Sequence, residues 1–181
     1  MKTGCRPLLA LCLMLAGCGS SAPADRTVTS PSKTVRAADK AITDVAATDT
    51  FLAITADLPE NGNDTVDQVA EIASEIGQSI KSGAKDVGSK VAKISIFYRV
   101  PEKDRLGNDE HTKLLTLYYD VPDLKRANYK GLSAYGILDL STSTEIRPAM
   151  ADKSVVPFCG SYREQVPLFC GRTDEQMQLP N

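Results

Sequence analysis

The chain has 181 residues and contains no tryptophan, a single histidine and few aromatic side chains, which make up 6% of its composition. So few rings exclude an aromatic core, and we expect the interior to be filled mainly by Val, Ile, Leu and Ala. The single histidine, His111, stands beside Asp109 and Glu110 in a polar segment. We expect it to be solvated rather than catalytic, which leaves the chain without a base for triad chemistry.

Motifs that indicate enzymatic chemistry are missing as well. The sequence has no nucleophile-elbow Gly-x-Ser-x-Gly, no phosphate-binding Gly-Lys-Ser/Thr loop, no dinucleotide fingerprint, no zinc-binding helix motif and no calcium loop. Asp104 with Asp109 or Glu110 could supply a carboxylate pair for glycoside hydrolysis, but acids are common near turns and no spacing singles these out. The sequence therefore predicts a protein that is not an enzyme and has no cofactor and no metal.

The only long apolar run lies at the N-terminus. Lys2 and Arg6 precede it, it extends from Leu8 to Leu15, and small residues follow. This run is too short to span a bilayer, and the order of charge, apolar run and small residues is typical of an export signal. The alternative is a buried first helix of a cytosolic domain, which would require the helix-breaking residues 17–20 to continue into a fold.

The end of this run, Leu15-Ala16-Gly17-Cys18, resembles the lipobox of bacterial lipoproteins. In such proteins the cysteine takes a diacylglycerol, a peptidase cuts before it, and the new amino terminus is acylated, as by palmitate. The resemblance implies a signal peptide over 1–17 and lipidation of Cys18. Three acyl chains would hold the protein on the bilayer, since each buried methylene contributes about 0.8 kcal/mol. Gly19 after the cysteine implies the outer membrane, on the side that faces the periplasm.

The five cysteines are consistent with export. Cys5 and Cys12 lie in the signal and Cys18 takes lipid, so Cys159 and Cys170 remain as a pair. In an oxidising periplasm we expect this pair to form a disulfide, worth about 3 kcal/mol for a loop of about a dozen residues. A metal site is a weaker alternative, because the two cysteines lack a tight chelating spacing. A redox-active pair would need the spacing Cys-x-x-Cys.

Charge and length limit the partners and the domain count. Loss of residues 1–17 would leave 19 of the 21 basic side chains against 23 acidic ones, and so mildly acidic a chain is a poor candidate for nucleic acid. No second stretch is long enough to cross a membrane. Residues 18–34 are small and polar, which predicts a lipidated flexible tether, followed by a single periplasmic α+β domain over 35–181.

Apolar spacing predicts the first half of this domain. Within residues 35–45, apolar residues recur at steps of three and four and indicate a short helix. Residues 51–54 suit a strand or a continuing helix. The clearest helix follows a candidate cap at Asn63 or Asp64. Its buried stripe consists of Val66, Val69, Ala73, Ile76 and Ile80. Core packing is favoured over a coiled-coil partner, because the stripe lasts little over two heptads.

Alternation of apolar and polar residues predicts two strands, over 93–100 and 115–121, which form an antiparallel hairpin around the charged loop Pro101 to Thr112. Their apolar face can cover the helix stripe. The expected fold class is therefore α+β: a small two-layer domain with an amphipathic helix packed on an antiparallel β-hairpin or sheet, and a disulfide-stapled C-terminal region.

The last third of the chain is less regular. Pro122 ends the second strand and Asp123 can cap a short helical turn, while residues 132–147 fit either strand or helix. The segments 156–160 and 166–171 nearly repeat the sequence Val-Pro-Phe-Cys-Gly, and we expect the disulfide to fasten them as a small loop or hairpin. The prolines argue against a central strand. A stapled edge is favoured over a recognition tip.

The expected function is that of a non-catalytic binding or accessory module of the cell envelope, held on the lipid bilayer through Cys18. Its partner would be another envelope protein, contacted by the loop 101–112 and by the Cys159–Cys170 region. The alternative is a periplasmic inhibitor or protective protein that blocks a hydrolase by inserting a rigid loop, with the stapled tail as the first candidate.

Overall fold

The computed structural model describes residues 30–83, 87 and 90–177. The expected signal segment and Cys18 lie outside the described residues. In chain order the elements are α1 (Ser30–Arg36), β1 (Ile42–Ala47), β2 (Phe51–Asp57), α2 (Thr65–Ser82), β3 (Lys93–Lys103), β4 (Asp109–Asp120), α3 (Val121–Arg126), α4 (Gly136–Asp139), β5 (Ser143–Ile146), α5 (Pro148–Ala151), α6 (Val155–Tyr162) and α7 (Pro167–Met177). The first helix thus begins inside the segment 18–34 that the sequence predicts to be a tether.

The five strands form one sheet in the order β1-β2-β3-β4-β5. Strands β2 and β3 run parallel, and every other neighbouring pair is antiparallel. Parallel neighbours need a crossover connection, and α2 provides it between β2 and β3. The predicted α+β class and the predicted β3–β4 hairpin are both confirmed.

Helix α2 packs its apolar stripe against the sheet, as its sequence predicts. All five residues of the predicted stripe are buried, and so are the facing side chains of β3 and β4. Burying a side chain of this size contributes roughly 1.5–3 kcal/mol, so helix and sheet stabilise each other. The buried Tyr98 hydroxyl donates to the carbonyl of Val69 at 3.1 Å and so connects β3 directly to the backbone of α2.

The predicted cap of α2 lies at the right position but makes no side-chain bond. Asp64 precedes the helix without a cap hydrogen bond from its carboxylate. Instead the hydroxyl of Thr65 accepts from the backbone N–H of Gly62 at 2.7 Å and donates to the carbonyl of Glu60 at 3.2 Å. The buried threonine therefore orders the turn that leads into the helix.

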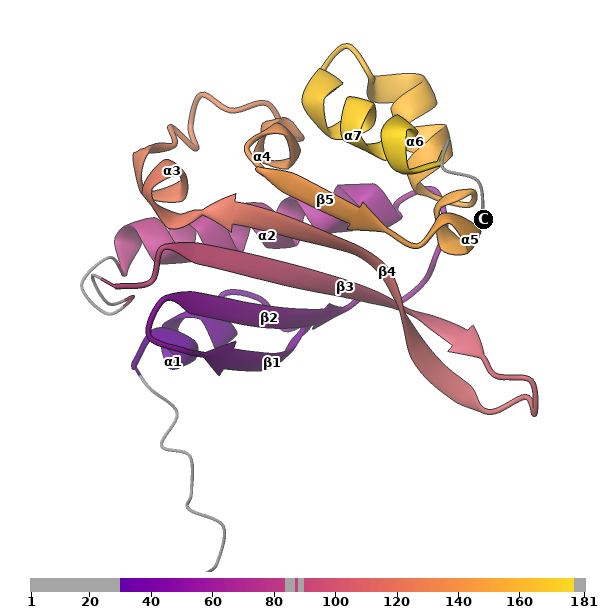
Figure 1. Cartoon of the computed structure of the whole chain (residues 1–181), viewed down its shortest axis with the longest axis horizontal. Coiled ribbons are helices and arrows are strands. Elements are labelled where there is room, and N and C mark those ends of the chain that lie inside the picture. The colour runs from indigo at the N-terminus through magenta and orange to yellow at the C-terminus, as the bar shows by residue number, and fades with distance from the viewer. Residues whose placement is uncertain (1–29, 84–86, 88–89, 178–181) are drawn as a thin grey trace, which may run out of the picture.

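The helices gather on one side of the sheet, which gives the domain two layers. Helices α1, α3, α4 and α6 contact α2, and α7 lies along β5. Figure 1 views the sheet from the other side, where no described helix crosses the strands. Among the described residues, no helix is long and apolar enough to cross a membrane.

The short helix expected over residues 35–45 is only half right. It ends at Arg36, and Ile42 begins strand β1. The Asp39 carboxylate accepts from the backbone N–H of Ala41 at 2.5 Å and turns the chain between the two elements. Branched side chains such as Ile42 and Val45 favour the strand. Residues 51–54, which the sequence allows as strand or helix, belong to β2, and residues 132–147 contain the short helix α4 and then β5.

The C-terminal region is helical, so the expected loop or hairpin around the disulfide is wrong. The repeated prolines stand at the beginnings of α6 and α7, where a missing N–H costs nothing. The disulfide itself is confirmed: Cys159 and Cys170 are bonded, with 5.5 Å between their Cα atoms, and both are buried. The rings of Phe158 and Phe169 meet edge to face beside it, at 6.2 Å.

The turn helix after β4 forms as predicted, with a different cap. Helix α3 begins at Val121, and its N-cap position is Asp120 rather than Asp123. Asp123 lies in the first turn, where its carboxylate pairs with the guanidinium of Arg126 at 2.5 Å. Pro122 at the start of this helix removes a donor that no helical carbonyl could have accepted.

Candidate functional site

The hairpin β3–β4 continues beyond the rest of the sheet as a two-stranded projection, which we call the arm (residues 101–112). Strand β2 stops pairing with β3 at Arg99, and β5 begins pairing with β4 at Leu115. From Val100 to Lys103 the strand pairs with β4 alone. Figure 1 shows the arm standing clear of the body of the domain. It is the part of the described chain that offers both faces to solvent.

The arm changes direction at its root because the ladder is irregular there. A register shift lies between Tyr98 and Arg99, and such bulges bend and twist a hairpin. Arg99 forms a bidentate pair with Asp57, with its Nε and one terminal nitrogen 2.6 and 2.9 Å from the carboxylate oxygens. This hydrogen bond and the charge of Asp57 raise the pKa of Arg99, although burial opposes the shift. The root is therefore tied to the end of β2.

Three further contacts hold the root from the β5 side. The guanidinium of Arg147, just after β5, lies 3.6 Å from the carboxylate of Glu102 and donates to the hydroxyl of Thr112. Next to it, Lys113 and Glu145 pair at 2.6 Å across β4 and β5. Both strands of the arm are thus connected to the body by charged side chains as well as by the backbone.

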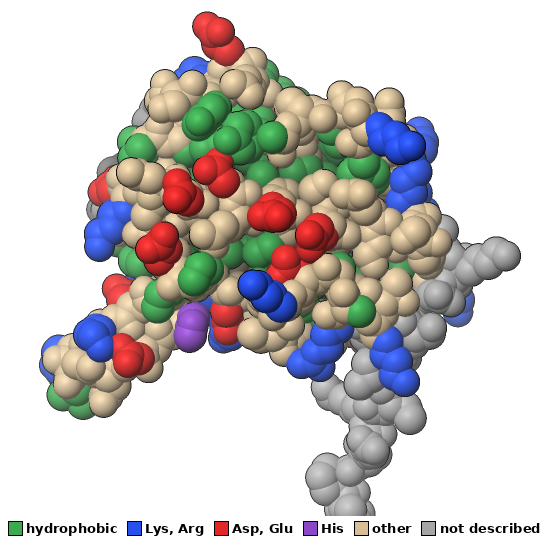
Figure 2. Space-filling model, turned by 180° about the vertical axis from the view of Figure 1, so that it is seen from behind, with side chains coloured by type: hydrophobic (Ala, Val, Ile, Leu, Met, Phe, Trp, Pro, Cys, Tyr) green, Lys and Arg blue, Asp and Glu red, His purple; other side chains and the backbone are tan. Residues whose placement is uncertain are grey.

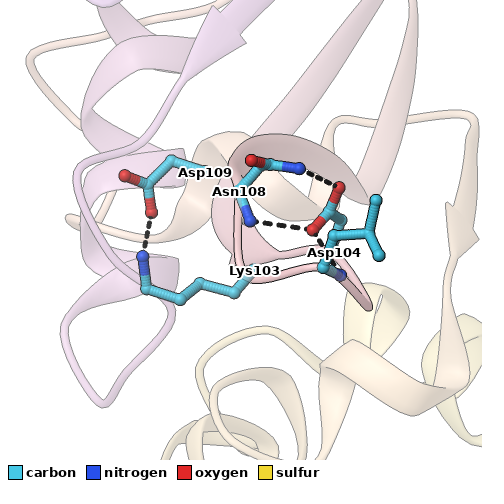
Figure 3. A network of polar contacts seen from close by, with 5 residues as sticks. Lys103, Asp104, Asn108 and Asp109 are labelled. Atoms are coloured by element: carbon cyan, nitrogen blue, oxygen red, sulfur yellow. Dashed lines mark hydrogen bonds and ion pairs between the residues drawn. The ribbon is translucent and has the colours of Figure 1, made fainter.

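Figure 3 shows the tip of the arm, where one carboxylate organises the turn. One oxygen of Asp104 accepts from the backbone N–H groups of Leu106 and Asn108, both at 2.8 Å, and the other accepts from the Asn108 side-chain amide at 2.9 Å. These bonds, the Asn108 side chain first among them, lower the pKa of Asp104. Gly107 has φ of 86°, a conformation that glycine adopts without strain.

The result is a fixed tip with an apolar apex. Lys103 and Asp109 pair across the last rung of the ladder, below the turn. The side chain of Leu106 is 79% exposed, more than the other exposed large hydrophobic side chains of the described residues. Leu106 is therefore the apolar side chain that the tip of the arm presents to solvent.

The acidic residues and the histidine that the sequence offers as candidates for catalysis all lie on this arm. The carboxylate of Asp104 is occupied by the turn, and that of Asp109 by Lys103. Glu110 is exposed and lies opposite Glu102, and His111 is exposed and lies opposite Pro101.

The disulfide region, the second predicted contact, is built differently. Both of its cysteines are buried. Val156 and Leu168 are its exposed apolar side chains, and both lie on regular helices. Cys18, the predicted lipidation site, lies outside the described residues.

The face of α2 turned away from the sheet carries a row of acids. Figure 2 shows the molecule from behind, with acidic side chains gathered over the middle of this face. Along α2, Asp67, Glu71 and Glu75 follow one another at steps of four residues, and Asp39 lies beside Glu75. Burial and the neighbouring acids, Asp39 first among these, raise the pKa of Glu75. Among the described residues, no three Asp, Glu, His or Cys side chains form a group that could hold a metal ion.

The arm is a feature that the sequence only half reveals. Its charged residues predict a loop from Pro101 to Thr112, but the structure continues both strands to Lys103 and Asp109 and confines the turn to the residues between them. An exposed two-stranded ribbon buries neither face, so its sequence lacks the apolar alternation that marks a strand. The Asp-x-x-Gly-Asn spacing of the tip is the signal that could have located the turn.

Comparison of this chain with protein-family models, with curated proteins and with solved structures finds no match.

Proposed function

We propose that this protein is a lipid-anchored module of the bacterial cell envelope that binds another envelope protein through its arm and performs no catalysis itself. The observation that carries the proposal is the arm, which is tied to the body at its root, ordered at its tip and topped by the exposed Leu106. Binding energy is concentrated in a few anchoring side chains, and a surface that is already ordered loses little entropy on binding.

The anchor in this proposal is Cys18, held in the outer membrane on the side that faces the periplasm. The chain from Cys18 to the start of α1 at Ser30 can span about 40 Å when fully extended. That reach would hold the start of the domain within about 40 Å of the lipid surface. The acidic face of α2 would be repelled by anionic lipid headgroups, which favours orientations that turn it away from the bilayer.

A second candidate function, that of a periplasmic inhibitor, is favoured by the shape of the arm. A narrow two-stranded ribbon with a rigid, apolar tip can enter the cleft of a hydrolase, whereas the C-terminal helices present a broad surface. In this version the inserted element is the arm, and the disulfide region serves only to stabilise the body.

The test is photo-crosslinking in intact cells with a photoreactive amino acid in place of Leu106 in the full-length chain. The matched control places the same amino acid at Leu168, which is 59% exposed but lies on α7. We expect a defined covalent partner for position 106 and none for position 168, identified by mass spectrometry. A structural envelope component would support the accessory role and a hydrolase would support the inhibitor. Equal or absent crosslinking at the two positions would contradict both.

The anchor has its own test. With Cys18→Ser we expect uncleaved or soluble precursor instead of a processed, membrane-bound form, detected by cell fractionation and intact mass. Normal processing and membrane attachment of this variant would show that the lipobox interpretation is wrong.

A further inference from the structure

The two edges of the sheet are finished in different ways. At the β5 edge, the side-chain amide of Gln176 takes the place of a neighbouring strand: its oxygen accepts from the backbone N–H of Ile146 at 2.8 Å, and its nitrogen donates to the carbonyl of Thr144. Helix α7 holds this amide along the strand. The β5 edge is therefore closed to further pairing.

At the opposite edge, no described strand pairs with the outer side of β1. The backbone N–H of Thr48 donates to the carbonyl of Phe51 at 2.8 Å. This bond determines which residues of β1 are hydrogen-bonded to β2. Hydrogen-bonded residues alternate along an antiparallel strand, so Ala46, which faces Ala53, turns its peptide groups toward β2. The peptide groups of Val45, one residue earlier, consequently point away from the sheet.

The same alternation turns the peptide groups of Ala47 outward, and the carbonyl of Thr43 also points there. This carbonyl accepts a hydrogen bond from the exposed guanidinium of Arg36 at 2.6 Å. That contact covers one end of the edge and leaves the middle uncovered. Natural edge strands are commonly protected by lysines, prolines or bulges, but β1 contains no lysine and no proline, and its bulge lies at its beginning.

We propose that β1 pairs antiparallel with β1 of a second copy of this chain, about a two-fold axis at Val45. In this register Val45 faces Val45 of the second copy, and Thr43 faces Ala47 of the second copy. The peptide groups of Val45 and Ala47 and the carbonyl of Thr43 are the groups that point outward, so they would find hydrogen-bonding partners. The interface is isologous, as in most homodimers, and it joins two sheets into one.

The side chains of β1 fit this pairing. Asp44 would lie opposite Ala46 of the second copy, so no two like charges face each other across the axis. Val45 is partly buried against the core on the helix side of the sheet, and the pair of valines would extend the apolar layer across the axis. The guanidinium of Arg36 would exchange its bond to Thr43 for solvent, which costs little because it is exposed.

One short strand from each copy gives a small interface, below the roughly 1,200 Å² of stable complexes, so the pairing would be weak in dilute solution. Two copies held on the same membrane meet at a much higher local concentration. In this respect the inference rests on the lipid anchor of the proposed function. Helix α1 contacts β1, so the first described residues of both copies would lie on the side of the axis.

The test is disulfide crosslinking of the full-length chain in isolated membranes, read on non-reducing gels after mild oxidation. Val45→Cys places one thiol of each copy at the axis, where the Cα atoms of a hydrogen-bonded pair are about 5.5 Å apart, within the range of a disulfide. Ala47→Cys is the matched control, because two copies of this position would lie about 14 Å apart. The unsubstituted chain gives the background from its own cysteines.

We expect a covalent dimer for Val45→Cys, background for Ala47→Cys alone, and a dimer again when Thr43→Cys and Ala47→Cys chains are co-expressed. The last pair uses exposed positions, so it stays informative if Val45→Cys does not fold. Background levels for both dimer-forming combinations, or equal dimer for Ala47→Cys alone, would overturn the proposal. Fractionation of the same cells reports the anchor separately. If the chain proves to be unanchored, the same crosslinks on the purified chain at high concentration decide the pairing.

Discussion

The two halves of the β3–β4 hairpin are ordered by different forces. Inside the body, Ile96 and Leu117 face each other in the ladder and are completely buried under α2. In the arm, the last facing pair is Lys103 and Asp109, whose side chains are 67% and 87% exposed. The same two strands thus pass from a region held by burial to one held by short-range polar contacts.

This difference shows how a small domain can present a shaped surface without a large core. The body contributes the free energy of folding, because burial of apolar side chains is its main source. The arm contributes little to it, since exposed ion pairs are worth at most about 1 kcal/mol each. Residues on the arm can therefore serve contact, because the fold does not depend on them.

The strongest test of this comparison removes a buried side chain from the hairpin. We expect Ile96→Ala to lower the free energy of unfolding by about 2–5 kcal/mol, because it leaves a cavity between β3 and α2. The matched change on the arm, Leu106→Ala, should stay within about 0.5 kcal/mol of the unchanged chain. Urea unfolding followed by circular dichroism measures both. Similar losses for the two variants would show that the arm is part of the cooperative core.

The disulfide belongs to the body in this comparison. Replacing both Cys159 and Cys170 by serine should cost about 3 kcal/mol, because the bond closes a loop with a sequence separation of 11. The same urea experiment measures the loss, and crosslinking through position 106 should persist under conditions where the variant is folded. A selective loss of that crosslink in the folded variant would mean that the C-terminal helices also form part of the contact surface.

The smallest effect concerns the tip of the arm and its pH dependence. The pKa of Asp104 is lowered in the folded chain, so its hydrogen bonds stabilise the turn above the ordinary pKa of an aspartate. That contribution is lost as the pH falls through the lowered value, well below neutrality. Amide chemical shifts of Leu106 and Asn108 should therefore move in acid, while those of β3 inside the body stay unchanged.

Asp104→Ala is the counterpart of this titration at neutral pH. We expect the amides of Leu106 and Asn108 to exchange roughly two- to ten-fold faster, because each loses one hydrogen bond. Unchanged exchange at both amides would show that Gly107 and the Lys103–Asp109 pair suffice to order the turn.

The sequence predicts those elements in which burial of one face gives a periodic pattern of apolar residues. The stripe from Val66 to Ile80 and the alternation around Ile96 are visible because each element buries one face and exposes the other. The disulfide is predictable from cysteine number and compartment alone. These features were enough to derive the two-layer α+β class.

Short or atypical elements give no such signal. Strand β5 and helix α4 have four residues each, which is too few for a period of apolar residues to be recognised in the sequence. The segments with Val-Pro-Phe-Cys resemble turns, but their prolines occupy first turns of helices, a position that sequence alone does not separate from a loop. The sequence predicts a loop in place of the arm because both faces of the arm are polar.

The amide of Gln176 links the disulfide of the C-terminal region to the edge of the sheet. It terminates the sheet only as long as α7 stays in place, and α7 is fastened to α6 by the bond between Cys159 and Cys170. If reduction of that bond let α7 move, the amide would leave β5 and its backbone would become a template for another chain. The disulfide would thereby also guard the protein against aggregation.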